Sequence, residues 1–332
     1  MSSEMTAYVI EEHGEPDVFT ETTVERPEPG PEEIRVEVVA SSVNPVDYKI
    51  RQGAIPPFTP EFPATLHCDV AGIVDEVGSD VDRFEVGDEV YGIPGGAGRQ
   101  GSLADYAVGH AGTFAHAPET LPLADAAALP IVALTAWEML TDKASVGLDD
   151  DVLVYGASGG VGHIGVQLAD WFGATVTATG SSAEKRELAR ELGADETVDY
   201  TATDVASYVD EHADGDGFDV VFDPIGDDHL QTAFEAARPY GTVVTTESSS
   251  NQDISALQEK SLQLGVVIVI YPLLFDDRHE RTGKELADIA TLVDDGVIEP
   301  RIDERFSFDE VAAAHRRGES GEFTGKLLLV NE

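Results

Sequence analysis

The sequence has a single cysteine, Cys68, in 332 residues. One thiol excludes a disulfide within the chain and a structural zinc site built from four cysteines. Basic side chains are also few: 6 Lys and 14 Arg stand against 64 acidic residues, and the formal net charge is −44. A phosphate backbone needs a basic face, so this charge argues against nucleic acid and anionic membranes as partners.

Long hydrophobic runs are missing as well. The richest apolar stretch, residues 262–274, is too short to span a bilayer and contains Pro272. The first residues, Met1-Ser2-Ser3-Glu4, lack the basic and then apolar pattern of a secretory signal. We therefore expect a cytoplasmic protein without membrane partners.

The acidic residues are spread through the whole chain instead of gathering in a tail. Hydrophobic residues still make up 42% of the sequence, which is enough for sizeable cores in two domains. A uniformly acidic, lysine-poor surface over such cores predicts adaptation to a high-salt cytoplasm, where salt screens the repulsion between carboxylates.

Hydrophobic periodicity separates two kinds of segment. Residues 1–125 contain short apolar or alternating runs between turns rich in Pro and Gly, the pattern of a partly open β-barrel or sandwich. Residues 123–145 have helical periodicity, and strands and helices then alternate, which predicts an α/β fold with a doubly wound parallel sheet. The expected strands of that sheet are residues 152–155, 175–179, 196–198, 218–222, 242–246 and 265–270. A closing segment, with helices at 283–294 and 308–317 and a strand at 326–330, is expected to return to the first domain.

A glycine-rich run, Gly156-Ala157-Ser158-Gly159-Gly160-Val161-Gly162, lies between the first of these strands and a helix. Glycines in that position let the backbone approach a pyrophosphate, and the helix N-terminus offers unpaired N–H groups and a partial positive charge. The run therefore predicts a dinucleotide-binding turn.

The end of the second strand indicates which dinucleotide is bound. An NAD site usually has an Asp or Glu there for the ribose 2′-hydroxyl. This strand instead runs into Ser181 and Ser182, with Lys185 and Arg186 just beyond. Two hydroxyls and two cations suit a 2′-phosphate, so NADPH is favoured over NADH. In the alternative interpretation, the two cations pair with Glu184 and Glu187 on a solvated helix face.

Several short segments together carry a family pattern: SVNPVDYK at 42–49, CDVAG at 68–72, GDEV at 87–90, ASGGVG at 157–162, FDVVFDPIG at 218–226 and GKL at 325–327. With them, the chain resembles the medium-chain dehydrogenase/reductase superfamily, and more narrowly its zinc-independent quinone oxidoreductase and enone reductase branch. The resemblance covers essentially the whole chain. It implies a GroES-like, β-rich catalytic domain formed by residues 1–125 and 271–332, and a Rossmann dinucleotide-binding domain formed by residues 126–270.

The same resemblance addresses zinc. The zinc alcohol dehydrogenases of the superfamily have Cys where Asn44 stands and His where Cys68 stands, and their structural zinc lobe falls near residues 93–101, which contain no Cys or His. Asp47, His67, Cys68 and Asp69 offer some ligand atoms, but an amide such as that of Asn44 is a poor zinc ligand. We expect no metal, and carbonyl polarisation by hydrogen-bond donors instead.

The resemblance also implies roles for individual residues. Asn44, Tyr48 and Lys49 are the catalytic candidates beside the nicotinamide, with Tyr48 donating to the developing enolate; in the alternative, Asn44 only starts a turn and Tyr48 only packs. Besides Lys185, the expected cofactor contacts are Thr135, Ser158, Gly159, Gly160, Val161, Ser181, Ser182, Tyr200, Ile225, Thr246 and Lys326, the last one at a cofactor phosphate.

The strand expected at residues 265–270 is β-branched, uncharged and continuous. Exposed at a sheet edge, it would need a cover, so we expect a homodimer in which this strand pairs with its copy. In the alternative it is a central strand within one subunit.

The sequence thus favours an NADPH-dependent, zinc-free reductase of quinones or α,β-unsaturated carbonyls. A zinc-dependent alcohol or sugar dehydrogenase and a non-catalytic NADPH-binding protein are the alternatives. The sequence does not name the physiological substrate, because neither fold nor cofactor fixes it.

Overall fold

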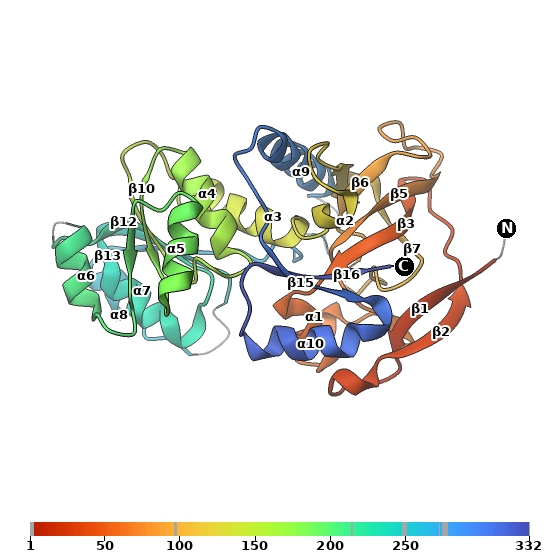
Figure 1. The fold of residues 1–332 in the computed structure, drawn as a ribbon, viewed down its shortest axis with the longest axis horizontal. Coiled ribbons are helices and arrows are strands. Elements are labelled where there is room, and N and C mark those ends of the chain that lie inside the picture. Colours follow the sequence, from red (N-terminus) through yellow and green to blue (C-terminus); the bar gives the residue numbers. More distant parts are fainter. Residues whose placement is uncertain are drawn as a thin grey trace. The chain divides into compact units, whose positions relative to one another are not determined.

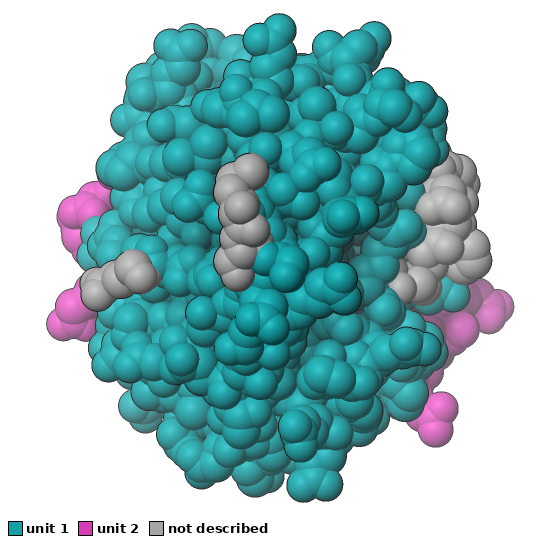
Figure 2. Space-filling view, turned by 90° about the vertical axis from the view of Figure 1, so that its right-hand side faces the viewer, with its two compact units in different colours: residues 1–134, 269–296, 300–332 teal, residues 135–268, 297–299 magenta. Residues whose placement is uncertain are grey.

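The computed structural model describes residues 3–95, 98–213, 215–247, 251–271, 273 and 278–331. The chain divides into two compact units (Figures 1 and 2). Unit 1 comprises Met1–Leu134, Val269–Gly296 and Pro300–Glu332, and unit 2 comprises Thr135–Ile268 and Val297–Glu299. The sequence places the domain boundaries after residues 125 and 270. In the structure, unit 1 also includes residues 126–134 and 269–270, and unit 2 also includes residues 297–299.

Unit 2 is built on a six-stranded sheet in the order β11-β10-β9-β12-β13-β14, and every neighbouring pair is parallel. This order is the one expected of two βαβαβ halves, so the predicted doubly wound sheet is confirmed. The strands are β9 (Asp151–Val154), β10 (Thr175–Thr179), β11 (Glu196–Val198), β12 (Phe218–Asp223), β13 (Ala237–Thr245) and β14 (Gln263–Val266). The helices between them are α4 (Gly162–Trp171), α5 (Ala183–Glu191), α6 (Val205–His212), α7 (Leu230–Ala236) and α8 (Ser255–Glu259).

The core of this sheet comes from alternating apolar residues of its central strands. Leu153 of β9, Val221 of β12 and Val243 of β13 are fully buried with the helix residues Leu230 and Phe234 of α7. The strands are short and nearly continuous in apolar residues because helices cover the sheet, as parallel sheets require.

The last strand differs from its prediction. β14 ends at Val266, so residues 267–270 continue beyond the ladder, and it is an edge strand of the six. The alternative of a central strand is therefore wrong. Val266 and Ile268 are 37% and 48% exposed, whereas Val267 is buried to 2%.

Unit 1 is mostly antiparallel. A seven-stranded sheet has the order β15-β16-β3-β5-β6-β8, with β7 pairing β3, and a three-stranded sheet has the order β2-β1-β4. Two sheets fit the barrel or sandwich pattern of the sequence. The strands are β1 (Glu4–Ile10), β2 (Thr20–Glu25), β3 (Glu33–Ser42), β4 (Ala64–Thr65), β5 (Val70–Val77), β6 (Glu89–Gly92), β7 (Tyr106–His110), β8 (Phe114–His116), β15 (Ile302–Ser307) and β16 (Lys326–Val330).

The helices of unit 1 are α1 (Pro45–Arg51), α2 (Leu123–Ala126), α9 (His279–Asp294) and α10 (Val311–Ser320), together with the first half of α3 (Pro130–Glu138). Strand β16 pairs antiparallel with β3, from Leu328 opposite Ser42 to Val330 opposite Ala40. The expected return of the closing segment to the N-terminal sheet is therefore confirmed, and this pairing sets the start of β16 beside the start of α1.

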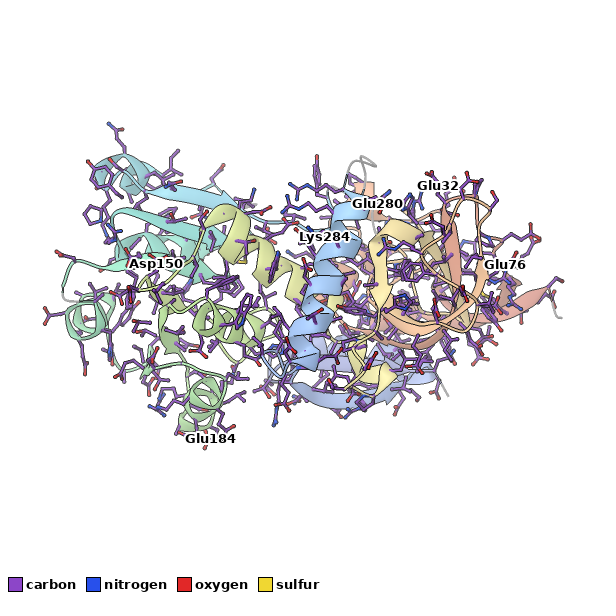
Figure 3. The ribbon with its side chains drawn as sticks, turned by 90° about the horizontal axis from the view of Figure 1, so that it is seen from above. Glu32, Glu76, Asp150, Glu184, Glu280 and Lys284 are labelled. Atoms are coloured by element: carbon purple, nitrogen blue, oxygen red, sulfur yellow. The ribbon has the colours of Figure 1, made fainter. Side chains whose placement is uncertain are left out.

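Acidic side chains project from both units (Figure 3). Glu32 and Glu184 are exposed, and Glu76 and Glu280 are 51% and 79% exposed as side chains even though each lies beside an arginine. Among the described residues, no helix is both long enough and apolar enough to span a membrane.

Candidate functional site

The glycine-rich turn of unit 2 has a steric reason for its glycines. Gly156, directly after β9, has a φ of +59°, a left-handed conformation that glycine adopts at no cost. A Cβ added to Gly162 would lie 2.1 Å from the Gly156 carbonyl oxygen, and one added to Gly165 would lie 2.8 Å from the Phe222 ring. Glycine therefore lets the turn close tightly and lets α4 pack on β12.

The turn between these glycines holds four of the predicted cofactor residues: Ser158, Gly159, Gly160 and Val161. Ser158 is buried and the other three are half-buried, directly before α4. The first N–H groups of a helix have no partner inside the helix, and they bind anions. A tight glycine turn that leads into a helix N-terminus fits the pyrophosphate of a dinucleotide.

A second group lies where β10 and β11 end side by side, with Thr179 opposite Val198. Ser182 caps α5 by accepting from the Lys185 backbone N–H at 3.3 Å. Arg186 donates to the Gly180 carbonyl at 3.1 Å and pairs with Asp199 at 2.8 Å. The ion-pair partner of Arg186 is thus Asp199, and Glu187 pairs with Arg190.

Two other members of this group, Ser181 and Tyr200, are open to solvent, and Lys185 is half-buried. Ser181 is exposed, Tyr200 is 53% exposed, and the Lys185 ammonium forms no ion pair with any residue the structure describes. The structure thus brings Ser181, Ser182, Lys185 and Tyr200 to one edge of the sheet. Their contacts with a cofactor stay a prediction.

A third group closes the same edge after β12. Asp223 is fully buried, and its Oδ1 accepts from the backbone N–H groups of Ile225 at 3.2 Å and Gly226 at 3.3 Å and contacts His229 Nδ1 at 3.0 Å. Asp223 therefore shapes the turn that leaves Ile225 50% exposed. Thr246 donates to the Pro224 carbonyl at 3.0 Å, so Ile225 and Thr246 lie in one local arrangement.

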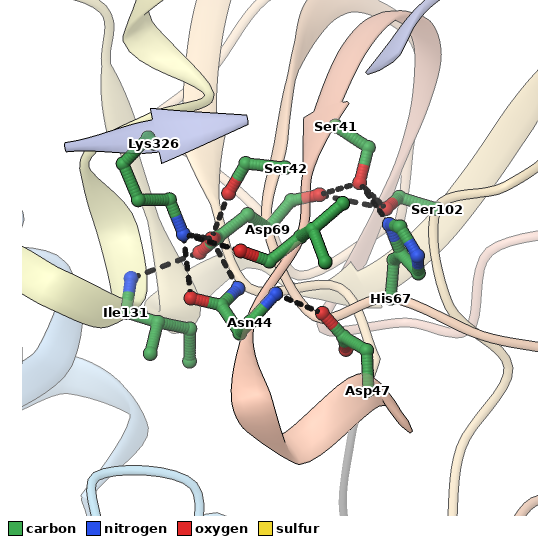
Figure 4. Close-up of polar contacts among 10 residues, drawn as sticks. Ser41, Ser42, Asn44, Asp47, His67, Asp69, Ser102, Ile131 and Lys326 are labelled. Atoms are coloured by element: carbon green, nitrogen blue, oxygen red, sulfur yellow. Dashed lines mark hydrogen bonds and ion pairs between the residues drawn. The ribbon is translucent and has the colours of Figure 1, made fainter. Parts of the chain in front are cut away.

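One catalytic candidate of unit 1, Asn44, belongs to a buried polar cluster (Figure 4). Asp69, directly before β5, is completely buried. Its Oδ2 accepts from Ser42 Oγ at 2.5 Å and Asn44 Nδ2 at 2.7 Å, and its Oδ1 accepts from the Ile131 N–H at 2.8 Å. The cluster thus joins β3, the starts of α1 and α3, and the strand that Asp69 precedes.

The prediction that Lys326 binds a cofactor phosphate is wrong for this structure. Its side chain is buried, with Nζ donating to Asn44 Oδ1 at 2.6 Å and to the Val43 carbonyl at 3.0 Å, and lying 3.6 Å from Asp69 Oδ2. Burial lowers the pKa of this ammonium, and Asp69 opposes that shift. The Lys326 ammonium therefore bonds to groups inside unit 1, because the start of β16 lies beside the start of α1.

Asn44 is also turned inward. It is 2% exposed, its amide bridges Lys326 and Asp69, and its backbone N–H donates to Asp47 Oδ2 at 2.7 Å. Asn44 starts α1, as the turn alternative expects. Its direct contact with a substrate stays a prediction.

Tyr48 and Lys49 follow on α1, and both are half-buried. Burial and the neighbouring Asp47 raise the pKa of the Tyr48 phenol to about 12. The phenol is therefore protonated at neutral pH and can donate a hydrogen bond. Its ring also packs beside Gly318 of α10, where a Cβ would lie 3.7 Å from Tyr48 Cε1.

The residues at the zinc positions do not fit a zinc ion. Asn44, at the position of the family's zinc-binding Cys, offers only an amide, and that amide already bonds Lys326 and Asp69. Asp69 already accepts three hydrogen bonds and faces the Lys326 ammonium. A divalent cation would have to displace an ammonium from this cluster. Among the described residues, no group of three or more His, Cys, Asp and Glu is arranged to hold a metal.

Sequence reasoning considered Asp69 only as a possible metal ligand and missed Asp223 as a site residue. Both stand in quoted segments, but in a chain with 64 acidic residues nothing local separates a buried carboxylate from a surface one. Their neighbours gave a weak signal, since Asp69 directly precedes the apolar strand β5 and Asp223 is the last residue of the apolar strand β12.

Comparisons with known families match both parts of the chain. Residues 30–119 match the alcohol dehydrogenase GroES-like domain, and residues 192–329 match the zinc-binding dehydrogenase family. The predicted combination of a GroES-like domain and a Rossmann-type parallel sheet is thereby confirmed.

Curated relatives cover nearly the whole chain. The mitochondrial NAD(P)H oxidoreductase RTN4IP1 of Mus musculus is 34% identical, over 99% of this chain and 89% of its own length. The 2-methylene-furan-3-one reductase of Solanum lycopersicum is 33% identical, over 98% and 79%. The quinone oxidoreductase of Pseudomonas aeruginosa is 32% identical, over 96% and 97%.

Solved structures agree. An alcohol dehydrogenase superfamily protein from Novosphingobium aromaticivorans superposes with a TM-score of 0.93 at 35% identity, covering 99% of this chain and 100% of that one. The Escherichia coli quinone oxidoreductase, solved with NADPH, gives a TM-score of 0.86 at 26% identity, covering 98% and 99%.

Proposed function

Because the chain belongs to the medium-chain dehydrogenase/reductase superfamily, with quinone oxidoreductases among its relatives, we propose that it is an NADPH-dependent, zinc-free reductase of quinones or α,β-unsaturated carbonyls. The observation that carries this proposal is the buried cluster of unit 1, in which Lys326 bonds Asn44, at one of the family's zinc positions, and faces Asp69, directly after the other. Chemistry at such a site relies on hydrogen-bond donors.

NADPH, when bound, supplies a hydride to an electron-poor carbon. The glycine-rich turn and the first N–H groups of α4 would hold its pyrophosphate, and Ser181, Ser182 and Lys185 would bind the 2′-phosphate. The free Lys185 ammonium supports NADPH over NADH. A relative that is solved with NADPH supports the same choice.

The remaining chemistry falls to donors of the chain. As hydride adds to a quinone or to the β-carbon of an enone, negative charge develops on the carbonyl oxygen. The neutral Tyr48 phenol would donate a hydrogen bond to that oxygen, and Lys49 would raise the local potential. Tyr48 keeps its proton because its pKa lies well above neutral. The tomato relative is named for reducing a 2-methylene-furan-3-one, which is an enone and supports this substrate class.

The test is NADPH oxidation in high salt with a panel of quinones and enones. We expect turnover that survives dialysis against a strong chelator, and a Tyr48→Phe variant with reduced kcat and nearly unchanged KM for NADPH. A stoichiometric zinc tied to activity would instead favour the zinc alcohol dehydrogenase. NADPH binding without turnover of any substrate would favour the non-catalytic alternative.

The acidic surface supports two further proposals: a high-salt cytoplasm as the compartment, and folding that depends on salt. For the assembly we propose a homodimer that covers the open edge of β14. Val266 and Ile268 are the apolar side chains left exposed along that edge.

A further inference from the structure

The buried cluster connects four segments of unit 1 that are far apart in sequence. Asp69 precedes β5, Lys326 begins β16, Asn44 precedes α1, and Ile131 lies in the first turn of α3 (Figure 4). Asp69 and Lys326 are both buried, at 0% and 2% exposure. A charge pair in such a place is costly unless hydrogen bonds satisfy both partners.

Hydrogen bonds satisfy both the Asp69 carboxylate and the Lys326 ammonium, and each has a defined donor and acceptor. The carboxylate of Asp69 accepts from Ser42, Asn44 and the Ile131 N–H. The Asn44 amide lies between the two charges, with its oxygen toward Lys326 at 2.6 Å and its nitrogen toward Asp69 at 2.7 Å. The amide therefore has one favourable orientation, which fixes the start of α1.

One carboxylate thus holds the first residues of two helices. Tyr48 comes four residues after Asn44 in α1, and Thr135 comes four residues after Ile131 in α3. Four residues are about one helical turn. Each predicted contact residue therefore lies one turn beyond a point that is bonded to Asp69.

We propose that Lys326 and Asp69 are positioning residues, which hold the starts of α1 and α3 so that Tyr48 and Thr135 are presented to substrate and cofactor. The roles of Tyr48 and Thr135 rest on the proposed function. The inference that Asp69 and Lys326 fix the starts of the two helices depends only on the contacts of the buried cluster. A small misplacement of contact groups has a large kinetic effect, since about 1 Å can cost about 100-fold in rate.

The experiment compares three variants with the parent enzyme. Lys326→Met removes the cation and leaves Asp69 as a lone buried charge, so its melting temperature should fall. Lys326→Met combined with Asp69→Asn removes both charges and should regain much of that melting temperature. Ser42→Ala removes one donor to Asp69 and is mild enough to fold.

We expect kcat for a quinone or enone to fall about 100-fold in both Lys326 variants, and several-fold in Ser42→Ala. The Kd for NADPH should change by no more than several-fold, because most predicted cofactor contacts lie on the glycine-rich turn and at the end of β10. The matched control is Lys260→Met in unit 2, whose ammonium also donates to backbone carbonyls, those of Phe234, Glu235 and Ala237. It should lower the melting temperature and leave kcat at the parent value.

Recovery of kcat together with melting temperature in the double variant would show a purely stabilising role and overturn the proposal. A raised Kd for NADPH with unchanged kcat in Lys326→Met would restore a phosphate role for Lys326, and would equally overturn it.

Hydrogen exchange separates this inference from the proposed function. The Ile131 and Asp47 amides should exchange faster in Lys326→Met and in Ser42→Ala, while the amides of β10 should not change. Unchanged exchange at Ile131 would refute the positioning role even in an active enzyme. A parent protein inactive with every substrate, but with the expected exchange pattern, would refute only the proposed function.

Discussion

The glycine-rich turn gives the sharpest test of cofactor binding, through Gly162→Ala. The new Cβ would lie 2.1 Å from the Gly156 carbonyl oxygen and 2.7 Å from its carbon, whereas ordinary contact begins at 3.4 Å. Both neighbours are backbone atoms, so no side chain can rotate away. The turn would have to open by roughly 1.3 Å to reach van der Waals contact.

Two effects should follow from that opening. Overpacking of this kind costs about 1–3 kcal/mol of the free energy of unfolding. Losing one or two hydrogen bonds from the turn to a charged phosphate costs about 1.5–3 kcal/mol each, so the Kd for NADPH should rise by at least about tenfold.

The assay is a fluorescence titration with NADPH, alongside thermal unfolding of the same samples. Gly147→Ala is the matched control, because a Cβ there would meet nothing within 4 Å. It should leave both the Kd and the melting temperature unchanged. A Gly162→Ala protein that binds NADPH as tightly as the Gly147→Ala protein would show that the turn does not hold the cofactor.

Four other predictions follow from the structure. Lys185→Ala should raise the KM for NADPH with little effect on that for NADH; equal kinetics of the parent enzyme with both cofactors would contradict this. Burial lowers the pKa of His67 well below 6.5 and that of His315 to about 3, so both stay neutral in the folded state but bind protons when unfolded. The free energy of unfolding should therefore fall as pH drops below about 6.5, by up to about 1.4 kcal/mol per pH unit for each histidine. Burial raises the pKa of Asp47 to about 7, so this carboxyl binds its proton more tightly in the folded state and acts in the opposite direction. Chemical denaturation should therefore show a net fall in the free energy of unfolding close to that expected for one histidine. A free energy of unfolding that rises toward pH 5 would refute this prediction. The melting temperature should rise between 0.1 M and 1 M salt, where the screening length falls from about 10 Å to about 3 Å, and an unchanged value would exclude repulsion as a major term. Light scattering in high salt should find a dimer, and Ile268→Lys should weaken it, because Ile268 is exposed beside β14 whereas Val267 is buried. A dimer that Ile268→Lys does not weaken would exclude the β14 edge as the dimer interface.

Local patterns in the sequence were enough to place the sheet of unit 2. Strands β10 and β11 occur at their predicted bounds because β-branched runs between glycine turns and amphipathic helices leave little choice of conformation. The glycines of the cofactor turn could also be identified from sequence, since a strand, a close turn and a helix follow one another within a short segment.

Other features depended on which distant segments meet. The side chain of Lys326 was expected at a phosphate, but the pairing of β16 with β3 places it beside Asn44 and Asp69 instead. The strand expected at residues 265–270 ends at Val266. Its backbone pairing stops there because the neighbouring strand β13 ends at Thr245, which lies opposite Val266.

The sequence by itself determined the two kinds of domain, the dinucleotide turn and the acidic surface, because each depends on composition or on neighbours within a few turns of chain. Only the tertiary structure decided which carboxylates and cations are buried. Asp69, Ile131 and Lys326 are separated by 62 residues or more, and a hydrogen bond and an ion pair that no local pattern encodes join Asp69 to the other two. Among 64 acidic residues, burial alone distinguishes the carboxylate that organises a site from one that hydrates the surface.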